Sequence, residues 1–142
     1  MTAVPQAIDA LVEVLRRELR PAQVFDGPAT YGVTGDAVWV GITPDDPNLD
    51  APHAVAGLGK AREAFEVRCL ARSWSGSADV AAQRRKAYAL VNRAKTALIA
   101  DETLGGAVMT ARYAGSLYVP YFDEQRRLVV DVIFRVAVTA FS

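Results

Sequence analysis

Residues 127–141 read Arg127-Leu128-Val129-Val130-Asp131-Val132-Ile133-Phe134-Arg135-Val136-Ala137-Val138-Thr139-Ala140-Phe141. Large apolar residues occupy every second position of this stretch, and that period belongs to a β-strand: Val130, Val132, Phe134, Val136 and Val138. A strand of about fifteen residues is long. One this apolar has to pair on both sides and lie under a helix, so we expect the sheet to be built around it.

The rest of the chain divides into helical and extended segments around this strand. Residues 5–19 are predicted to form a helix with Thr2 as its N-cap. The reason is a stripe of apolar residues at helical spacing: Ile8, Leu11, Val12, Leu15 and Leu19. A second helix is expected to begin at Ser77, its cap, and to end at about residue 100. Strands are expected over 22–25, 36–42, 62–74 and 107–122. The last of these strands is expected to be irregular near Gly115 and Pro120. The predicted fold is α+β, a mainly antiparallel sheet with two helices packed on it, in the order α-β-β-β-α-β-β.

Length, charge and cysteine content narrow the class of protein. With 142 residues, 51% of them hydrophobic, the chain is expected to form one domain over 1–142 with its own core. Lys+Arg 16 equals Asp+Glu 16, whereas a dedicated nucleic-acid binder carries a basic excess. The one cysteine, Cys69, has no partner for an internal disulfide, which favours a reducing compartment. We expect a soluble intracellular domain, because neither a signal peptide nor a membrane-spanning stretch is recognisable.

Residues 43–60 contain three prolines and two glycines and are predicted to form a long loop. Loops of this length inside a domain are usually functional or become ordered on a partner. Asp46-x-Asn48-x-Asp50 imitates the start of an EF-hand loop, but Ala51 and Gly57 replace its required Gly and Glu. We take the charged residues of the loop as candidate contact residues instead: Asp45, Asp46, Asp50 and His53.

The sequence contains no recognisable group of catalytic, cofactor-binding or metal-binding residues. His53 is the only histidine, which excludes a site with two histidines. Gly59-Lys60 lacks the first glycine and the hydroxyl of a phosphate-binding loop. Cys69 points inward on its strand and is expected to be an inert core residue. We therefore predict that the protein is not an enzyme and needs no cofactor.

Three features leave two interpretations open. The second helix carries a run of cations, either a solvated face or a contact with a partner or with passing DNA: Arg84, Arg85, Lys86, Arg93 and Lys95. Trp39 is either a core residue under a helix or an anchor at a subunit contact. The first helix lies on the sheet or on a membrane surface, and its mixed charges favour the sheet.

Taken together, these segments resemble the tail terminator proteins of long-tailed bacteriophages, especially those that infect actinobacteria. The resemblance covers nearly the whole chain as an order of elements with short signatures. The signatures are the helix at 11–19, Val24-Phe25-Asp26-Gly27-Pro28, Val38-Trp39-Val40-Gly41, the strand 62–72 that opens Arg-Glu-x-Phe-x-Val, the Ala- and Arg-rich second helix, Thr103-Leu104-Gly105-Gly106, and the final strand.

This resemblance implies a structural virion protein. It would form a ring, typically of six subunits, that caps the tail tube, ends its polymerisation and joins the tail to the head connector. DNA would pass through the lumen without specific binding, and the protein would reside at the head-proximal end of the tail, or in the host cytoplasm during assembly. Candidate contact residues, besides those of the loop, are side chains expected to point away from the core: Leu70, Arg72, Trp74 and Tyr118.

Two other functions remain open. Another neck protein of the same virion, for head closure or connector completion, would bind the portal-side connector and fail to arrest tube growth. A bacterial small-ligand-binding or small enzymatic α+β domain would stay monomeric and show a ligand-dependent melting shift. The ring hypothesis predicts a mass near six chains.

Overall fold

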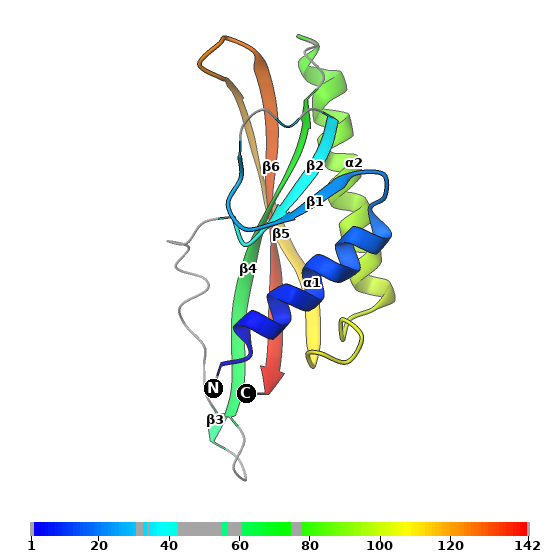
Figure 1. Cartoon of the computed structure of the whole chain (residues 1–142), viewed down its shortest axis with the longest axis vertical. Helices are drawn as coiled ribbons and strands as arrows, with labels where there is room; N and C mark the ends of the chain where they lie inside the picture. Colours follow the sequence, from blue (N-terminus) through cyan, green and yellow to red (C-terminus); the bar gives the residue numbers. More distant parts are fainter. Residues whose placement is uncertain are drawn as a thin grey trace.

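Two helices lie against one side of a curved, twisted sheet in this computed structural model (Figure 1). The structure describes residues 2–30, 33, 35–42, 55–56, 61–74 and 78–141. Its elements are α1 (Val4–Glu18), β1 (Gln23–Asp26), β2 (Gly35–Val40), β3 (Val55–Ala56), β4 (Ala61–Trp74), α2 (Val80–Ala100), β5 (Thr110–Phe122) and β6 (Leu128–Phe141). The predicted order is confirmed, with one addition, because the two-residue β3 lies within the segment predicted as a loop.

The sheet is mixed but mostly antiparallel, as predicted. Its strands follow the order β1-β2-β4-β6-β5, and β3 also pairs with β4. Only β1 and β2 run parallel; β4 pairs antiparallel with β2, β3 and β6, and β5 with β6. The final strand therefore has a neighbour on both sides, which confirms the expectation drawn from its alternation.

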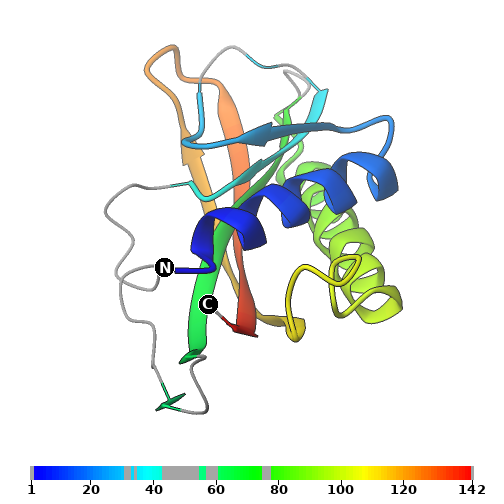
Figure 2. The same ribbon diagram turned by 60° about the horizontal axis from the view of Figure 1, so that its bottom comes forward.

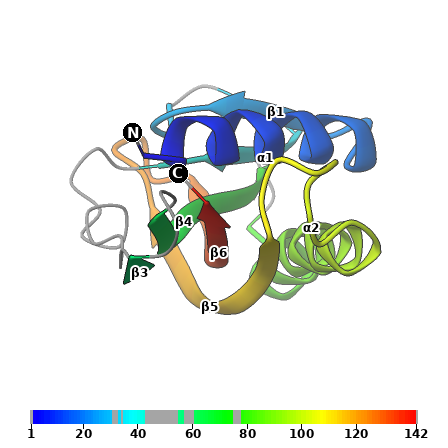
Figure 3. The ribbon, with the colours of Figure 1, turned by 90° about the horizontal axis from the view of Figure 1, so that it is seen from below.

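The main core lies between the sheet and the helices. The five alternating residues of β6, from Val130 to Val138, are all buried there. α2 packs on β4, β5 and β6, while α1 packs on β1, β2 and α2, so that the sheet curves around both helices when the molecule is seen from below (Figure 3). Burial of each of these five β6 side chains stabilises the fold by about 1.5–3 kcal/mol relative to leaving it exposed.

A carboxylate from β4 caps the start of α1. Glu63 accepts hydrogen bonds from the Ala3 N–H (3.1 Å) and from the Thr2 hydroxyl (2.8 Å). The predicted N-cap at Thr2 is wrong, because the cap position is Ala3 and has no side-chain hydrogen bond. A negative charge suits the positive end of the helix dipole. The capping group thus lies about sixty positions away in the sequence, where local patterns do not reveal it.

At the start of α2, Asp79 is the N-cap, and its side chain accepts a hydrogen bond from the Ala82 N–H (3.1 Å). The expected cap, Ser77, lies outside the described residues. Figure 2 shows α1 crossing in front of the long strands and α2 lying to their right, and α2 packs on β4, β5 and β6 whereas α1 packs on β1 and β2. The two helices therefore cover different ends of the same inner face.

The face away from the helices, here called the outer face, is closed over β1 and β2 by a second cluster. Because β1 and β2 run parallel, a crossover connection joins the end of β1 to the start of β2, and the structure describes residues 27–30 and 33 of it. Ala29 and Val33 from this connection pack against the buried residues of the outer face, which are Ala37, Trp39, Ile42 and Leu70. Trp39 is thus a core residue, as one interpretation held, but it lies under the connection and not under a helix.

Replacing Phe134 by alanine tests the core position of β6. Phe134 is fully buried, and its truncation is expected to lower the free energy of unfolding by about 3–5 kcal/mol. Phe141 lies on the same strand but is 52% exposed, so that Phe141→Ala, the matched control, is expected to change it by about 0.5 kcal/mol. Urea unfolding followed by tryptophan fluorescence measures both. Equal losses would contradict the placement of the core.

Candidate functional site

A buried ion pair joins β4 to β6 on the outer face. Arg72 and Asp131 lie opposite each other in the register, and the guanidinium binds the carboxylate twice, Nε to Oδ1 at 2.7 Å and Nη2 to Oδ2 at 3.0 Å. The side chains are only 8% and 6% exposed. Arg72 also donates to the Thr30 carbonyl and to the Tyr121 hydroxyl, which in turn donates to Asp131, each at 3.0 Å. The two buried charges are therefore paired with each other and hydrogen-bonded to their surroundings.

The surroundings of Arg72 keep it charged. Burial disfavours the charged form, but the hydrogen bonds and charge of Asp131, together with Tyr121, outweigh it, so that the pKa of Arg72 is raised above its ordinary value. The guanidinium carbon also lies 4.8 Å from the centre of the Trp39 ring, and Phe25 stacks on Trp39 with ring centres 5.5 Å apart. This cluster connects β1, β2, β4, β5 and β6 through charge, hydrogen bonds and ring contacts.

The turn between β5 and β6 is tied to the end of β4. Arg127 places its guanidinium 4.7 Å from the centre of the Trp74 ring and binds Asp123 through Nε at 2.9 Å. The Arg127 N–H, with that of Gln125, donates to the Asp123 carboxylate, and these bonds lower the pKa of Asp123. A cavity of about 30 Å³ lies between these groups and the ion pair. It has room for a water or two and for no metabolite.

β5 forms an edge of the sheet and carries exposed apolar side chains. Leu117 is 62% exposed and Phe122 is 68% exposed. Proline has no N–H to donate to β6, so we infer that the nitrogen of Pro120 faces the free side of the strand. A proline there removes a main-chain donor and discourages another strand from adding to the edge. This edge therefore favours contacts made by side chains.

A β-bulge decides which residues of β5 point outward. The register shifts between Tyr113 and Ser116, and Gly115 at this point has a φ of 116°. The extra residue shifts the alternation by one position. Consequently Tyr113 and Tyr118, five positions apart, both face the helices, and Leu117 faces away from them.

The structure separates the predicted contact residues. Four of them lie outside the described residues: Asp45, Asp46, Asp50 and His53. Leu70 and Arg72 do lie on the outer face, but the expectation that they are exposed there is wrong. Ala29 and Val33 pack against the cluster that includes Leu70, and the Thr30 carbonyl accepts a hydrogen bond from Arg72. Trp74 is half-buried beside the hairpin turn, close to Arg72, so these two are brought together at one cavity.

Tyr118 does not point outward, which corrects the sequence prediction. Its ring packs against Tyr88 of α2, with centres 6.2 Å apart, and the Arg84 guanidinium lies 5.8 Å from its centre. The exposed neighbour Leu117 was missed, because simple alternation cannot locate a bulge. Gly115 was the one signal for it, since a residue with positive φ at an irregular point of a strand is commonly glycine.

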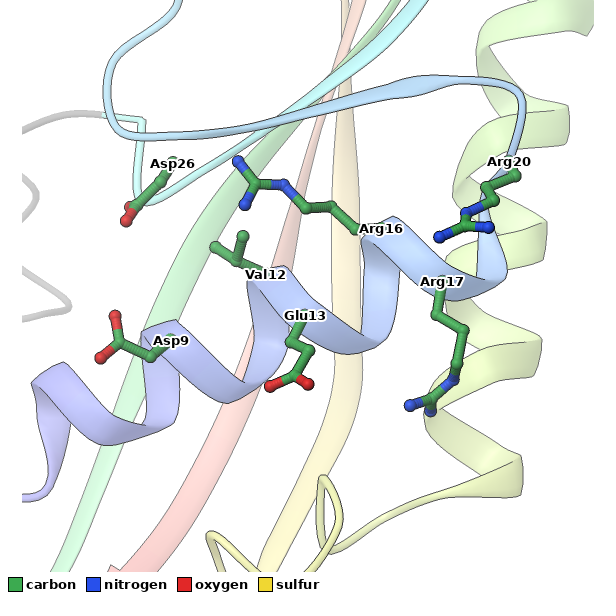
Figure 4. A pocket seen from close by; sticks show the side chains of 7 residues that line it. All are labelled: Asp9, Val12, Glu13, Arg16, Arg17, Arg20 and Asp26. Atoms are coloured by element: carbon green, nitrogen blue, oxygen red, sulfur yellow. The ribbon is translucent and has the colours of Figure 1, made fainter.

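A groove of about 540 Å³ follows α1 on the other side of the molecule and is lined almost wholly by charged residues (Figure 4). Asp9 and Asp26 lie toward one end, and Arg17 and Arg20 toward the other. Arg16 extends between α1 and β1, where its Nε donates to the Val24 carbonyl at 3.0 Å. Metabolite sites are mostly apolar with a few polar groups, so this groove is better suited to a charged macromolecular surface.

Within the described ranges, no three His, Cys, Asp or Glu side chains are placed to hold a metal ion. None of the helices described is long and apolar enough to cross a membrane.

Cys69 is buried on the inner face of β4. Burial raises the pKa of its thiol to about 12, although a backbone hydrogen bond from Gly41 acts in the opposite direction.

No family model and no curated protein matches this chain. Among solved structures, one similar chain is described as belonging to the virion of a native gene transfer agent particle. The two chains share 14% sequence identity over an alignment that covers 95% of this chain and 94% of the other, with a TM-score of 0.37. This is a distant structural similarity to a virion protein.

Replacing Arg72 by alanine leaves the Asp131 carboxylate buried without its cation. The free energy of unfolding is expected to fall by about 3–5 kcal/mol. The triple variant Arg72→Met, Asp131→Leu, Tyr121→Phe replaces both charged groups and the hydroxyl by apolar groups, so that no charge of the pair stays buried without its partner. It is expected to recover most of that loss. Urea unfolding compares the two. If the triple variant is as unstable as Arg72→Ala, the ion pair is not the reason for the loss.

Cys69 is expected to be unreactive in the folded protein. With a pKa near 12 almost no thiolate exists at pH 8, whereas a free thiol, with a pKa of about 8.5, is partly ionised there. Reaction with Ellman's reagent at pH 8 should therefore be at least roughly a hundredfold slower in buffer than in denaturing urea. A fast reaction of the folded protein would refute the placement of this thiol in the core.

Proposed function

We propose that this protein is a structural virion protein of the tail terminator kind. The whole chain, 1–142, acts as one domain, and copies of it form a ring of six on the end of the phage tail tube. The ring ends tube polymerisation and joins the tail to the head connector, and DNA passes through its lumen. The protein belongs to the head-proximal end of the tail and, before assembly, to the host cytoplasm.

The observation that carries this proposal is the exposed apolar edge of β5. Leu117 and Phe122 are more than half exposed on a strand that ends the sheet. We propose that another chain packs against this edge, because exposed apolar surface is favourably buried when proteins associate. The resemblance in the sequence, which extends over almost the full chain, supplies the identity of that other chain as a second copy.

A closed ring needs two different surfaces on each subunit. The β5 edge is at one end of the strand order and β1 at the other, and the charged groove along α1 lies on the β1 side. In the proposed ring, the β5 edge of one subunit meets the α1–β1 side of the next. Such a contact is heterologous, because the two joined surfaces differ.

The predicted contact residues take different parts in this proposal. Leu70 and Arg72 are buried and take part only indirectly, by stabilising the sheet. Trp74 is half-buried and offers the remaining part of its ring beside Arg127 and the hairpin turn. The charged residues of the loop are proposed to meet the tail tube or the head connector: Asp45, Asp46, Asp50 and His53.

The deciding experiment mixes the purified protein with tail-tube subunits. Rings with a mass near six chains and tubes of arrested length, seen by mass photometry and negative-stain electron microscopy, are expected. Tubes that keep growing while the protein binds the portal-side connector would favour another neck protein. A protein that stays monomeric beside the tube subunit would refute the proposal.

Replacing Leu117 by aspartate tests the edge itself. A charge there is expected to abolish ring formation or weaken it at least tenfold, because it must lose its water in the contact. Ile99→Asp is the matched control, since Ile99 is similarly exposed (68%) but lies on α2. The control is expected to form rings as the wild type does. If both variants behave alike, the β5 edge is not the subunit contact.

A further inference from the structure

The exposed side of α2 concentrates positive charge. The helix contains five cations and no carboxylate, and all five cations are exposed: Arg84, Arg85, Lys86, Arg93 and Lys95. These residues are here called the basic face of α2. Since the charges of the whole chain cancel, this face is a local excess that the net charge conceals.

The five cations surround the exposed half of the helix. At about 100° per residue, Arg84 and Lys95 share the shoulder toward β5, whereas Lys86 and Arg93 share the shoulder toward α1. Arg85 lies on the crest between the two shoulders. From the first cation to the last the helix rises about 16 Å. The charge is thus spread along a rod and is not gathered at one point.

Neighbouring groups hold three of the four shoulder cations in place without neutralising them. Arg84 lies 5.8 Å from the centre of the Tyr118 ring, and Lys95 lies 5.3 Å from that of Tyr113. Arg93 donates from Nη2 to the carbonyls of Glu18 (2.9 Å) and Arg20 (2.8 Å), at the end of α1. Within the described part of the chain, none of the five cations forms an ion pair with a carboxylate. Their full charge is available to a polyanion.

We propose that the basic face of α2 binds the phosphate backbone of double-stranded DNA. This inference rests on the proposed function, in which DNA passes through the ring, and it assigns α2 to the lumen. A duplex carries one charge per about 1.7 Å of its axis, so that cations spread along a rod meet phosphates in any register. The exposed residues between the cations include the short Ala89, Asn92 and Thr96, which suit phosphate contacts without base readout.

An acidic protein surface is the less favourable partner. A stable protein contact has an apolar, charge-depleted centre surrounded by a polar rim, but the crest of this helix is Arg85. The contact with DNA is therefore expected to be independent of sequence and strongly dependent on salt.

Binding of a fluorescein-labelled 30-base-pair duplex to the full chain, measured by anisotropy between 25 and 200 mM salt, tests this inference. The wild type is expected to bind with a slope of log K against log salt of about −3, which corresponds to three or four neutralised phosphates. Arg85→Glu with Lys86→Glu is expected to weaken binding at least tenfold and to make the slope shallower by about 2. The pair Arg85→Gln with Lys86→Gln removes the two positive charges without reversing them. Its affinity for the duplex should lie between that of the wild type and that of the charge-reversed pair.

The control removes the same charge elsewhere. Arg112→Glu with Arg126→Glu changes two exposed arginines of β5 and the hairpin turn, and at most a threefold loss is expected. Equal losses in the two charge-reversed variants, or no binding by the wild type at 25 mM salt, would overturn the inference. Competition by polyglutamate as effective as that by unlabelled duplex of equal charge would overturn it too, in favour of an acidic protein. Circular dichroism checks that each variant is folded.

Tube capping by the same proteins separates this inference from the proposed function. Wild-type protein that caps tubes but fails to bind the duplex refutes the α2 inference alone. Protein that binds the duplex through α2 but leaves tubes uncapped refutes the proposed function and leaves α2 as a DNA-binding face outside a ring.

Discussion

The register between β4 and β6 is the constraint on which the rest of this structure depends. In that register the apolar side chains of β6 face the helices, and Asp131 lies directly opposite Arg72 on the outer face. A slip by one residue would bring Asp131 under the helices and turn Phe134 toward the outer face. Both changes are costly, because one buries an unpaired charge and the other removes an aromatic ring from the core. Hydrophobic burial and charge pairing thus specify the same alignment.

The parallel pairing of β1 with β2 divides the outer face into two parts. Ala29 and Val33, from the connection between them, pack against the outer-face cluster that contains Trp39. Beyond that connection the sheet carries exposed charged residues, among them Arg112 and Arg135. Two arginines on the same face of β4 therefore differ in exposure: Arg72 is buried, whereas Arg62 is exposed. Strand alternation predicts on which face of the sheet a side chain lies. Whether that side chain is exposed to solvent depends on segments, distant in the sequence, that pack over the face.

Charge in this molecule is balanced in total and uneven in space. The groove along α1 is lined by both signs, which lie toward opposite ends (Figure 4). α2 carries one sign only. The buried charged groups of the described residues serve the fold, through the Glu63 cap on α1 and the Arg72–Asp131 pair. The surfaces left for function are an apolar edge and charged faces, which are the surfaces that the proposed assembly uses.

The sequence by itself determined the elements, their order and the inner face of the sheet. Period-two alternation in β6 and the helical stripe of α1 are local signals, because each depends only on which face of one element is buried. Only the tertiary structure decided the candidate site. The bulge at Gly115 changed the facing of Leu117 and Tyr118. Ala29, Thr30 and Val33 contact the buried cluster and Arg72 on the outer face, and Glu63 took the capping role expected of Thr2. Each of these outcomes depends on a partner group brought close by folding, and the spacing of residues along one segment carries no information about such a partner.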